Sequence, residues 1–231
     1  MTYIKSCAKL LLDFCQLNIL GWERERKGGN QMSKRLLSRA KVPLKPKTVI
    51  VIAGLPTTGK TSLGRALSLA TNVHFVDIDD GPANCAPPQE SNPYGSDEAR
   101  ARERARMAVA YTVLHAAVEE NLKQGFSVII SATYSRHSNQ EFLFSAVERG
   151  CGNMKFVLCQ YNDTTNEVKR RIQERLARGA IGGCRSVDHY FDDKSRYAGI
   201  KFSHITVMME GVEEGINRAV GQVLSYIQDK N

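Results

Sequence analysis

The sequence predicts an α/β domain in which a parallel sheet is covered by helices. The first reason is that five short runs rich in β-branched residues alternate with longer helical stretches from residue 48 onward. The second is that several of these helical stretches begin with capping residues and repeat apolar residues at three and four positions. At 231 residues and 25.7 kDa, the chain is long enough for one such domain with a well-buried core.

The five candidate strands are short and mostly apolar, as expected for strands that are buried on both faces of a sheet. The first has the sequence TVIVIA, and the second, VHFVDI, ends in acidic residues. In chain order the candidate strands are residues 48–53, 73–78, 126–133, 155–161 and 204–210.

Helices are expected between and after these strands. Ser96, followed by two acidic residues, begins a long helix that runs to about Gln124, and the last helix covers about residues 212–228. Two further starts fit the capping box, in which a hydroxyl and a carboxylate bind free N–H groups of the first turn. These two starts are Ser138 with Glu141 and Thr164 with Glu167. Residues 80–95, which contain four prolines, are expected to form one long loop.

Residues 1–46 are expected to be a basic N-terminal extension and linker, and residues 47–231 to form the domain. Residues 1–47 contain eleven basic and three acidic residues, so this segment accounts for the whole net charge of +8 and the remainder is neutral. The basic character therefore indicates little about what the domain binds. Two interpretations stay open: the working protein begins at Met32, or the extension is an arm that contacts nucleic acid or another protein.

The six cysteines form no C-x-x-C pair and no cluster with zinc-ligand spacing, so we expect no disulfide framework and a reducing compartment. No apolar run approaches the roughly 18 to 20 residues of a membrane span. The sequence therefore predicts a cytoplasmic protein with no membrane partner.

The stretch GLPTTGKTS follows the first candidate strand and precedes a helix. This is the context of a phosphate-binding loop, in which glycines let successive N–H groups converge on phosphate at the positive end of a helix. Lys60 is expected to bind the β- and γ-phosphate oxygens, and the hydroxyl of Thr61 to bind Mg²⁺. The residues expected to contact ATP are Gly54, Leu55, Pro56, Thr57, Thr58, Gly59, Lys60, Thr61 and Ser62.

Aspartates end the second candidate strand, in the sequence FVDIDDGP. The carboxyl edge of a parallel sheet is where ligands bind, so these carboxylates are expected on the acceptor side of the nucleotide. Asp79 is the candidate catalytic base, which accepts or orients the proton of an acceptor hydroxyl. Asp77, on the same strand face, is the candidate ligand for a water on the metal.

A basic helix follows the fourth candidate strand. Spacings of three and four residues place Arg171, Arg175 and Arg178 on one helix face, where guanidinium groups can close over a triphosphate as a lid. Arg175 and Arg178 are candidate catalytic residues, and Arg171 is a candidate nucleotide-binding residue. By contrast, the arginines within residues 99–107 fall around their helix, so they are expected to be solvated.

The order of these motifs, continued by SATYSRHSNQEFL and YFDDKSRY, resembles the small P-loop kinases that include polynucleotide kinase, chloramphenicol phosphotransferase, zeta toxin and gluconate kinase. The resemblance covers about residues 48–228. It implies a P-loop NTPase fold: a five-stranded parallel sheet with helices on both faces and an arginine-bearing lid. It also implies that the protein uses ATP and Mg²⁺, with the acceptor hydroxyl near the aspartate after the second strand.

Two positions depart from this resemblance. Members commonly read Asp-Ala-Thr at the end of the third strand, whereas this chain reads Ser131-Ala132-Thr133, so metal binding is expected to depend more on Thr61 and Asp77. Polynucleotide kinases carry an arginine three residues after the base, and here that residue is Pro82. The sequence therefore favours a small-molecule acceptor over a nucleic-acid acceptor.

The sequence thus predicts a kinase that transfers the γ-phosphate of ATP to a hydroxyl of a small-molecule acceptor. Two alternatives stay open. One is a polynucleotide 5′-hydroxyl kinase, which the basic extension favours. The other is a nucleotide-dependent switch that phosphorylates no acceptor, which Ser131 favours.

Overall fold

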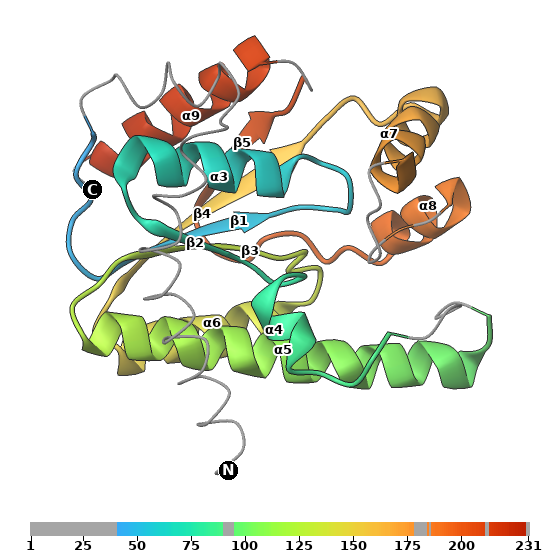
Figure 1. Ribbon diagram of the computed structural model, residues 1–231, viewed down its shortest axis with the longest axis horizontal. Coiled ribbons are helices and arrows are strands. Elements are labelled where there is room, and N and C mark those ends of the chain that lie inside the picture. The colour runs from blue at the N-terminus through green and yellow to red at the C-terminus, as the bar shows by residue number, and fades with distance from the viewer. Residues whose placement is uncertain (1–40, 90–94, 178–183, 185, 211–212, 230–231) are drawn as a thin grey trace.

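The computed structural model describes residues 41–89, 95–177, 184, 186–210 and 213–229. Its centre is a five-stranded parallel sheet with the strand order β2-β3-β1-β4-β5 (Figure 1). The strands are β1 (Thr48–Ala53), β2 (His74–Asp77), β3 (Val128–Ser131), β4 (Asn153–Gln160) and β5 (His204–Met208). Each coincides with or lies largely within a run that the sequence predicts, so the predicted sheet is confirmed.

Helices cover both faces of this sheet, as Figure 1 shows. One face packs against α3 (Lys60–Thr71) and α9 (Glu213–Gln228), and the other against α5 (Asp97–Lys123) and α6 (His137–Arg149). The central strand β1 alternates between the two apolar layers, with Ile50 and Ile52 in one and Val49 and Val51 in the other. This burial on both faces explains why its sequence is uniformly apolar.

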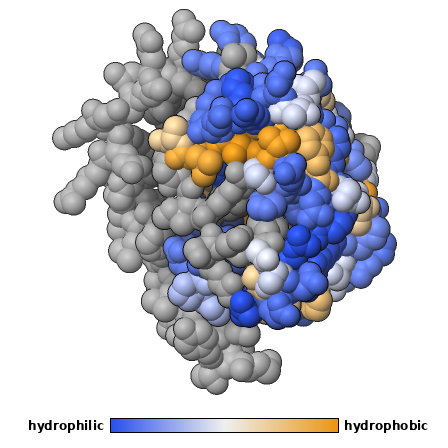
Figure 2. Space-filling model, turned by 90° about the vertical axis from the view of Figure 1, so that its right-hand side faces the viewer, coloured by the Kyte–Doolittle hydropathy of each residue, from blue (hydrophilic) through white to orange (hydrophobic). Residues whose placement is uncertain are grey.

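Two helices, α7 (Thr165–Ala177) and α8 (Val187–Ser195), lie beyond the carboxyl ends of the strands (Figure 1). They have a small apolar cluster of their own, in which Tyr161, Val168 and Tyr190 are buried. Figure 2 looks onto this end of the molecule, where hydrophilic residues cover most of the described surface and one hydrophobic band crosses it. The carboxyl edge of the sheet is therefore covered by two helices whose apolar cluster is distinct from the two apolar layers on the faces of the sheet.

Helix starts agree with the sequence in two cases and differ in one. The Ser96 hydroxyl accepts a hydrogen bond from Ala99 N at 3.1 Å at the start of α5, and the Thr164 hydroxyl accepts one from Glu167 N at 3.4 Å. The predicted cap at Ser138 is wrong, because α6 begins at His137 with Arg136 at its cap position. The loop expected over residues 80–95 also contains a short helix, α4 (Gly81–Asn84).

The segment before β1 already packs on the domain. Val42 N donates to Ala70 O at 3.1 Å, Leu44 contacts the apolar layer under α3, and Lys45 O accepts a hydrogen bond from the Ser127 hydroxyl. Described residues of the expected linker, from Val42 onward, thus pack on the domain ahead of residue 47. None of the described helices is both long and apolar enough to cross a membrane.

Candidate functional site

The loop between β1 and α3 has the backbone of an anion-binding turn. Gly54 has φ +145°, and a Cβ atom there would lie 2.5 Å from the carbonyl oxygen of Cys159, so only glycine fits. Gly59 has φ +90° immediately before α3, and Thr57 also has a positive φ of 65°. These angles curl the loop around the N-terminus of α3, where free N–H groups and the helix dipole favour negative charge.

Side chains of the loop bind its own backbone. The Thr58 hydroxyl and the Lys60 ammonium group both donate to Leu55 O, each at 2.8 Å. The Thr57 hydroxyl lies 3.1 Å from the Tyr161 hydroxyl, which links the loop to the end of β4. Pro56 is half-buried, and Ser62 is exposed on the first turn of α3. These contacts hold the loop backbone in this conformation.

Lys60 has an environment that favours an anionic partner. Burial lowers the pKa of its ammonium group, while the negative charges of Asp77 and Asp79 act in the opposite direction and Arg175 adds to the lowering. An amine taken out of water regains stabilisation when a polyanion such as a triphosphate approaches. The position of Lys60 thus fits the phosphate-binding role predicted for it.

Thr61 and Asp77 are in direct contact. The Thr61 hydroxyl donates to Asp77 Oδ2 at 2.6 Å, and the other carboxylate oxygen of Asp77 accepts a hydrogen bond from Asp79 N at 3.1 Å. A hydroxyl and a carboxylate side by side are the hard oxygen ligands that Mg²⁺ prefers. Among the described residues no group of three or more His, Cys, Asp or Glu could hold a metal. At kinase sites Mg²⁺ usually takes its remaining ligands from substrate phosphate and water.

Ser131 is the strand partner of Asp77 in the register of β2 and β3. Its hydroxyl is fully buried and has no hydrogen-bond partner within the part of the chain that the structure describes. An unpaired buried hydroxyl is unusual and needs a local reason. It lies beside the Thr61–Asp77 pair, at the position where the resemblance to small P-loop kinases implies an aspartate.

Asp79 lies close to the arginine helix α7. Arg175 Nη2 on α7 lies 3.7 Å from Asp79 Oδ2, and about half of the Asp79 side chain is exposed. Desolvation and the negative charge of Asp77 raise the pKa of the Asp79 carboxyl, whereas Arg175, Lys60 and Arg106 lower it. A carboxylate with a raised pKa at the edge of a crevice is suited to accept a proton.

Arg171 is held by protein groups. Its guanidinium group donates to Glu167 Oε1 at 2.6 Å, to Met209 O at 2.9 Å and to Thr57 O at 3.3 Å. It also lies over the ring of Tyr161 at 4.1 Å, and only 11% of its side chain is exposed. These contacts fasten α7 to the phosphate loop and to the end of β5.

The remaining lid residues can be placed only in part. Arg175 lies close to Asp79, whereas Arg178 lies outside the described residues. The predicted solvation of the arginines in residues 99–107 is wrong for Arg106, whose side chain is only 10% exposed and is paired with Glu103. Sequence spacing gave no sign of this burial, because it depends on where the helix docks.

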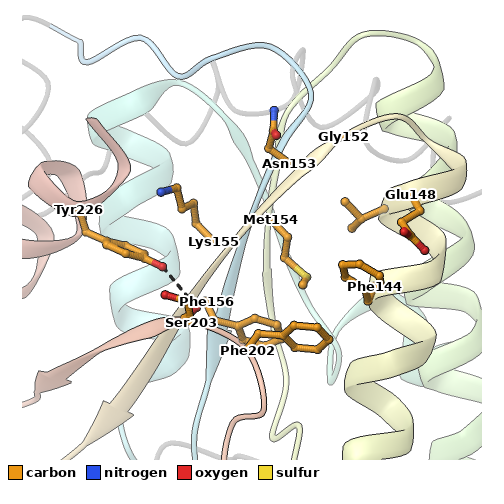
Figure 3. Close-up of a pocket in the computed structure, with 11 residues that line it drawn as sticks. Phe144, Glu148, Gly152, Asn153, Met154, Lys155, Phe156, Phe202, Ser203 and Tyr226 are labelled. Atoms are coloured by element: carbon orange, nitrogen blue, oxygen red, sulfur yellow. Dashed lines mark hydrogen bonds between the residues drawn. The ribbon is translucent and has the colours of Figure 1, made fainter. Parts of the chain in front are cut away.

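A pocket lies away from these residues, at the amino end of β4 (Figure 3). It measures about 440 Å³ and contains none of the predicted site residues. The rings of Phe144 and Phe202 stack with centroids 5.2 Å apart on one side, and Lys155 Nζ lies 4.8 Å from the centre of the Tyr226 ring on the other. The phosphate loop follows the carboxyl end of β1, so this pocket is separate from the candidate site.

Comparison with known proteins places the chain in a family. The model of the family described as AAA domain matches residues 49–184, which is more than half of the chain and includes the phosphate loop, both aspartates and α7. The chain belongs to the AAA domain family. A search of curated proteins finds no match to the sequence.

Several solved structures share the fold of this AAA domain protein. A candidate kinase from Chloroflexus aurantiacus is 22% identical with a TM-score of 0.60, and the match covers 78% of this chain and 98% of that one. A gluconokinase from Sinorhizobium meliloti is 17% identical with a TM-score of 0.53, covering 78% and 93% of the two chains. Kti12 from Chaetomium thermophilum, solved with ADP-AlF3, is 16% identical with a TM-score of 0.53, covering 78% and 100%. These structural matches show the fold, which is the P-loop fold of the small kinases that the sequence resembles.

Proposed function

We propose that this protein is an ATP-dependent kinase that transfers the γ-phosphate to a hydroxyl of a small-molecule acceptor. The observation that carries the proposal is the position of Asp79. Asp79 lies two residues after Asp77, which accepts a hydrogen bond from Thr61 at the start of α3, and its carboxylate lies 3.7 Å from Arg175 on α7. A nucleotide-binding loop alone would not need a proton acceptor there.

In this mechanism the loop N–H groups and Lys60 bind the triphosphate, and Thr61 and Asp77 hold Mg²⁺ directly or through its water. When bound, Mg²⁺ neutralises charge on the phosphate oxygens. Asp79 accepts the proton of the acceptor hydroxyl while the oxygen of that hydroxyl forms a bond to the γ-phosphorus. The bond from that phosphorus to the bridging oxygen breaks, and ADP leaves with the electron pair.

The arginines of α7 have two different roles in this proposal. Arg175 moves from Asp79 toward the transferred phosphoryl group and stabilises its charge. Arg171 acts as a positioning residue, because its guanidinium group already binds two backbone carbonyls and Glu167. Arg178 is proposed to assist Arg175, on the basis of its spacing in the sequence alone.

A nucleotide-dependent switch is the second candidate. One support is Ser131, because a serine rather than a second aspartate lies beside Asp77 at the proposed metal site. The other is the fold shared with Kti12, whose description names no phosphorylated acceptor. A polynucleotide kinase has less support, because Pro82 is buried in the first turn of α4 and offers no charge to a 5′ end.

The test is transfer of radiolabel from ATP carrying a labelled γ-phosphate, with Mg²⁺ and three parallel additions: a metabolite extract, a 5′-hydroxyl oligonucleotide or no acceptor. The proposal expects label in a small molecule from the extract, for both the full chain and a chain that begins at Met32. Label only in free phosphate would support the switch, and label in the oligonucleotide would support the nucleic-acid kinase.

A further inference from the structure

The amino end of β4 has an open edge. β4 pairs with β1 from Asn153 onward, whereas its ladder with β5 begins only at the pair Phe156↔His204. Residues 153–155 therefore have no strand partner on the β5 side in the described part of the chain. A strand edge of this kind presents N–H and C=O groups to which another extended segment can bind.

Met154 directs its backbone groups toward this open edge. In a strand, the N–H and C=O groups of successive residues point toward opposite neighbouring strands. Asn153 N donates to Lys47 O on the β1 side at 2.8 Å, and Gln160 O accepts from Met209 N on the β5 side at 2.7 Å. Met154 is one residue from the first contact and six from the second. Its N–H and C=O groups therefore face the β5 side, where the ladder has not yet begun.

The pocket of Figure 3 lies along this edge and has two different sides. Met154 points toward the side of α6, where the Phe202 ring stacks on Phe144 with centroids 5.2 Å apart. Lys155 points to the opposite side, where its Nζ atom lies 4.8 Å from the centre of the Tyr226 ring. An apolar side and a cationic side thus flank three residues of open strand edge.

The charges of the pocket restrict what can bind there. Lys155 has no ion pair within the described residues, so an acidic group beside it would be favoured. Among the described lining residues the acidic one is Glu148, which comes from α6 on the apolar side. A segment bound at the edge should therefore place a carboxylate beside Lys155 and apolar residues beside Phe144.

The N-terminal extension arrives at this end of the sheet. Lys47 O accepts the hydrogen bond of Asn153 N, and a Cβ atom on Gly152 would lie 2.9 Å from the same oxygen. Both Gly152 and Asn153 line the pocket. The 26 residues from 15 to 40 can span up to roughly 85 Å when extended, so residues before them can reach the pocket. Attachment to the same chain also gives them a high effective concentration there.

One tripeptide of this extension has the required pattern. Residues 1–40 contain three acidic residues, Asp13, Glu23 and Glu25, and only Asp13 stands between two apolar residues, Leu12 and Phe14. In an extended segment these two share one face and Asp13 lies on the other. A shift of one residue would exchange the two faces, so the sidedness of the pocket fixes the alignment.

We propose that Leu12–Phe14 of the same chain binds in extended form along the open edge of β4. Leu12 and Phe14 pack on the side of Phe144, and Asp13 pairs with Lys155. The backbone of the segment binds the N–H and C=O groups of Met154. This inference does not depend on the proposed kinase function, because the pocket is separate from the phosphate loop. It makes the extension a part of the domain.

Amide hydrogen exchange of the full chain, followed by NMR, tests the contact. The Met154 N–H should exchange slowly in wild type, because the bound segment accepts its hydrogen bond. Leu12→Asn/Phe14→Asn removes both apolar anchors and should speed this exchange about tenfold or more. Leu36→Asn/Leu37→Asn is the matched control, which removes two leucines elsewhere in the extension and should exchange like wild type. Unchanged exchange of Met154 in Leu12→Asn/Phe14→Asn would overturn the inference.

The N–H of Ile50, in the central strand, is the reference for general stability. Its exchange should be the same in all of these variants, since none changes a residue of the described domain. If Ile50 and Met154 became faster by the same factor, the variants would act on the stability of the whole fold. The contact at the edge of β4 would then be rejected.

A charge exchange tests the alignment. Asp13→Lys and Lys155→Glu should each speed exchange at Met154 about two- to fivefold, the range expected for an exposed ion pair. The double variant Asp13→Lys/Lys155→Glu restores opposite charges and should return exchange toward the wild-type rate. A double variant no slower than the single variants would show that Asp13 does not lie beside Lys155.

Dilution distinguishes one chain from two. Binding within one chain makes the exchange rate of Met154 independent of protein concentration. Protection that is lost on dilution, together with a dimer in analytical ultracentrifugation, would assign the bound segment to a second copy and overturn binding within one chain.

Discussion

The phosphate loop and the acceptor side of the crevice lie at the ends of neighbouring elements, yet they are held in different ways. The loop is fixed by its own contacts: Thr58 and Lys60 bind Leu55 O, and Arg171 on α7 binds Thr57 O. On the acceptor side, the Asp79 carboxylate has one ion pair among the described residues, at 3.7 Å from Arg175, and both side chains are partly exposed. The nucleotide half is therefore preformed, whereas the acceptor half has charges that can rearrange when a substrate enters.

This difference suggests what each half contributes to the reaction. A rigid loop binds a triphosphate with little loss of conformational entropy and presents its dipoles without rearrangement. A mobile ion pair can open when Arg175 is drawn to phosphate, which leaves Asp79 free for the acceptor. Variants on the nucleotide half should thus abolish transfer, and variants on the acceptor half should change its rate, its pH dependence or its substrate.

The largest effect is expected at Lys60. Lys60→Ala removes the charge aimed at the transferred phosphate and should lower kcat about 10²- to 10³-fold. The measurement is acceptor-dependent formation of ADP, with thermal unfolding as the control for a folded chain. If Lys60→Ala kept transfer within a few-fold of wild type, the loop would not be the site of the reaction.

The next largest effect is expected at Asp79. Asp79→Asn cannot accept a proton and should lower kcat about 100-fold with little change in the KM for ATP. Asp80→Asn is the matched control, because Asp80 is the exposed neighbour and has no assigned role. Equal loss of activity in both variants would mean that the acidic turn, rather than one carboxylate, carries the effect.

The pH dependence should reveal the ion pair. A base works only when deprotonated, so the rate should fall on the acid side as pH drops through the pKa of Asp79, which desolvation and Asp77 raise above the usual value. Arg175 lowers this pKa, so Arg175→Gln should move the acid limb of kcat/KM to higher pH as well as lower the rate. A limb that stays in place, or moves to lower pH, would show that Arg175 does not lower the pKa of Asp79 in the free enzyme.

The smallest effect is expected at Ser131. Its hydroxyl has no partner within the described chain, so Ser131→Ala should change the free energy of unfolding by less than about 1 kcal/mol. Ser131→Asp, in contrast, would place a carboxylate beside Asp77, its strand partner, and should be stabilised by Mg²⁺ more than wild type is. Thermal unfolding with and without Mg²⁺ tests both variants, and identical Mg²⁺ responses would place the metal elsewhere.

The sequence predicted the nucleotide half more fully than the acceptor half, for a physical reason. The conformation of Gly54 and the contacts of Thr58 and Lys60 follow from a short loop between a strand and a helix, so their spacing contains the geometry. The burial of Arg106 depends on how a 27-residue helix docks against α4, α6 and β3, and no local pattern records it. Arg171 shares a face with Arg175, but only the docking of α7 turns it toward Thr57 O.

Local sequence patterns also failed to predict the start of α6 and the presence of α4. Ser138 has a capping pattern, yet α6 begins one residue earlier, and Glu141 pairs with Lys201 at 2.6 Å instead of reaching back to a cap. The short α4 was missed because the four prolines of residues 80–95 favour a loop. Pro82, however, lies in the first turn of α4, where proline is tolerated. Both misses concern one turn of helix, and neither changes where the sheet presents its aspartates.

The measurement that tests the central claim most directly is the balance of products. Phosphorus NMR would follow ATP, ADP, inorganic phosphate and any new phosphomonoester in one sample of protein, Mg²⁺ and the accepting fraction of a metabolite extract. A kinase with Asp79 as its base predicts one new phosphomonoester for each ADP formed, and neither product with Lys60→Ala. Formation of ADP with an equal amount of inorganic phosphate, and no new ester, would contradict the account and favour a nucleotide-dependent switch.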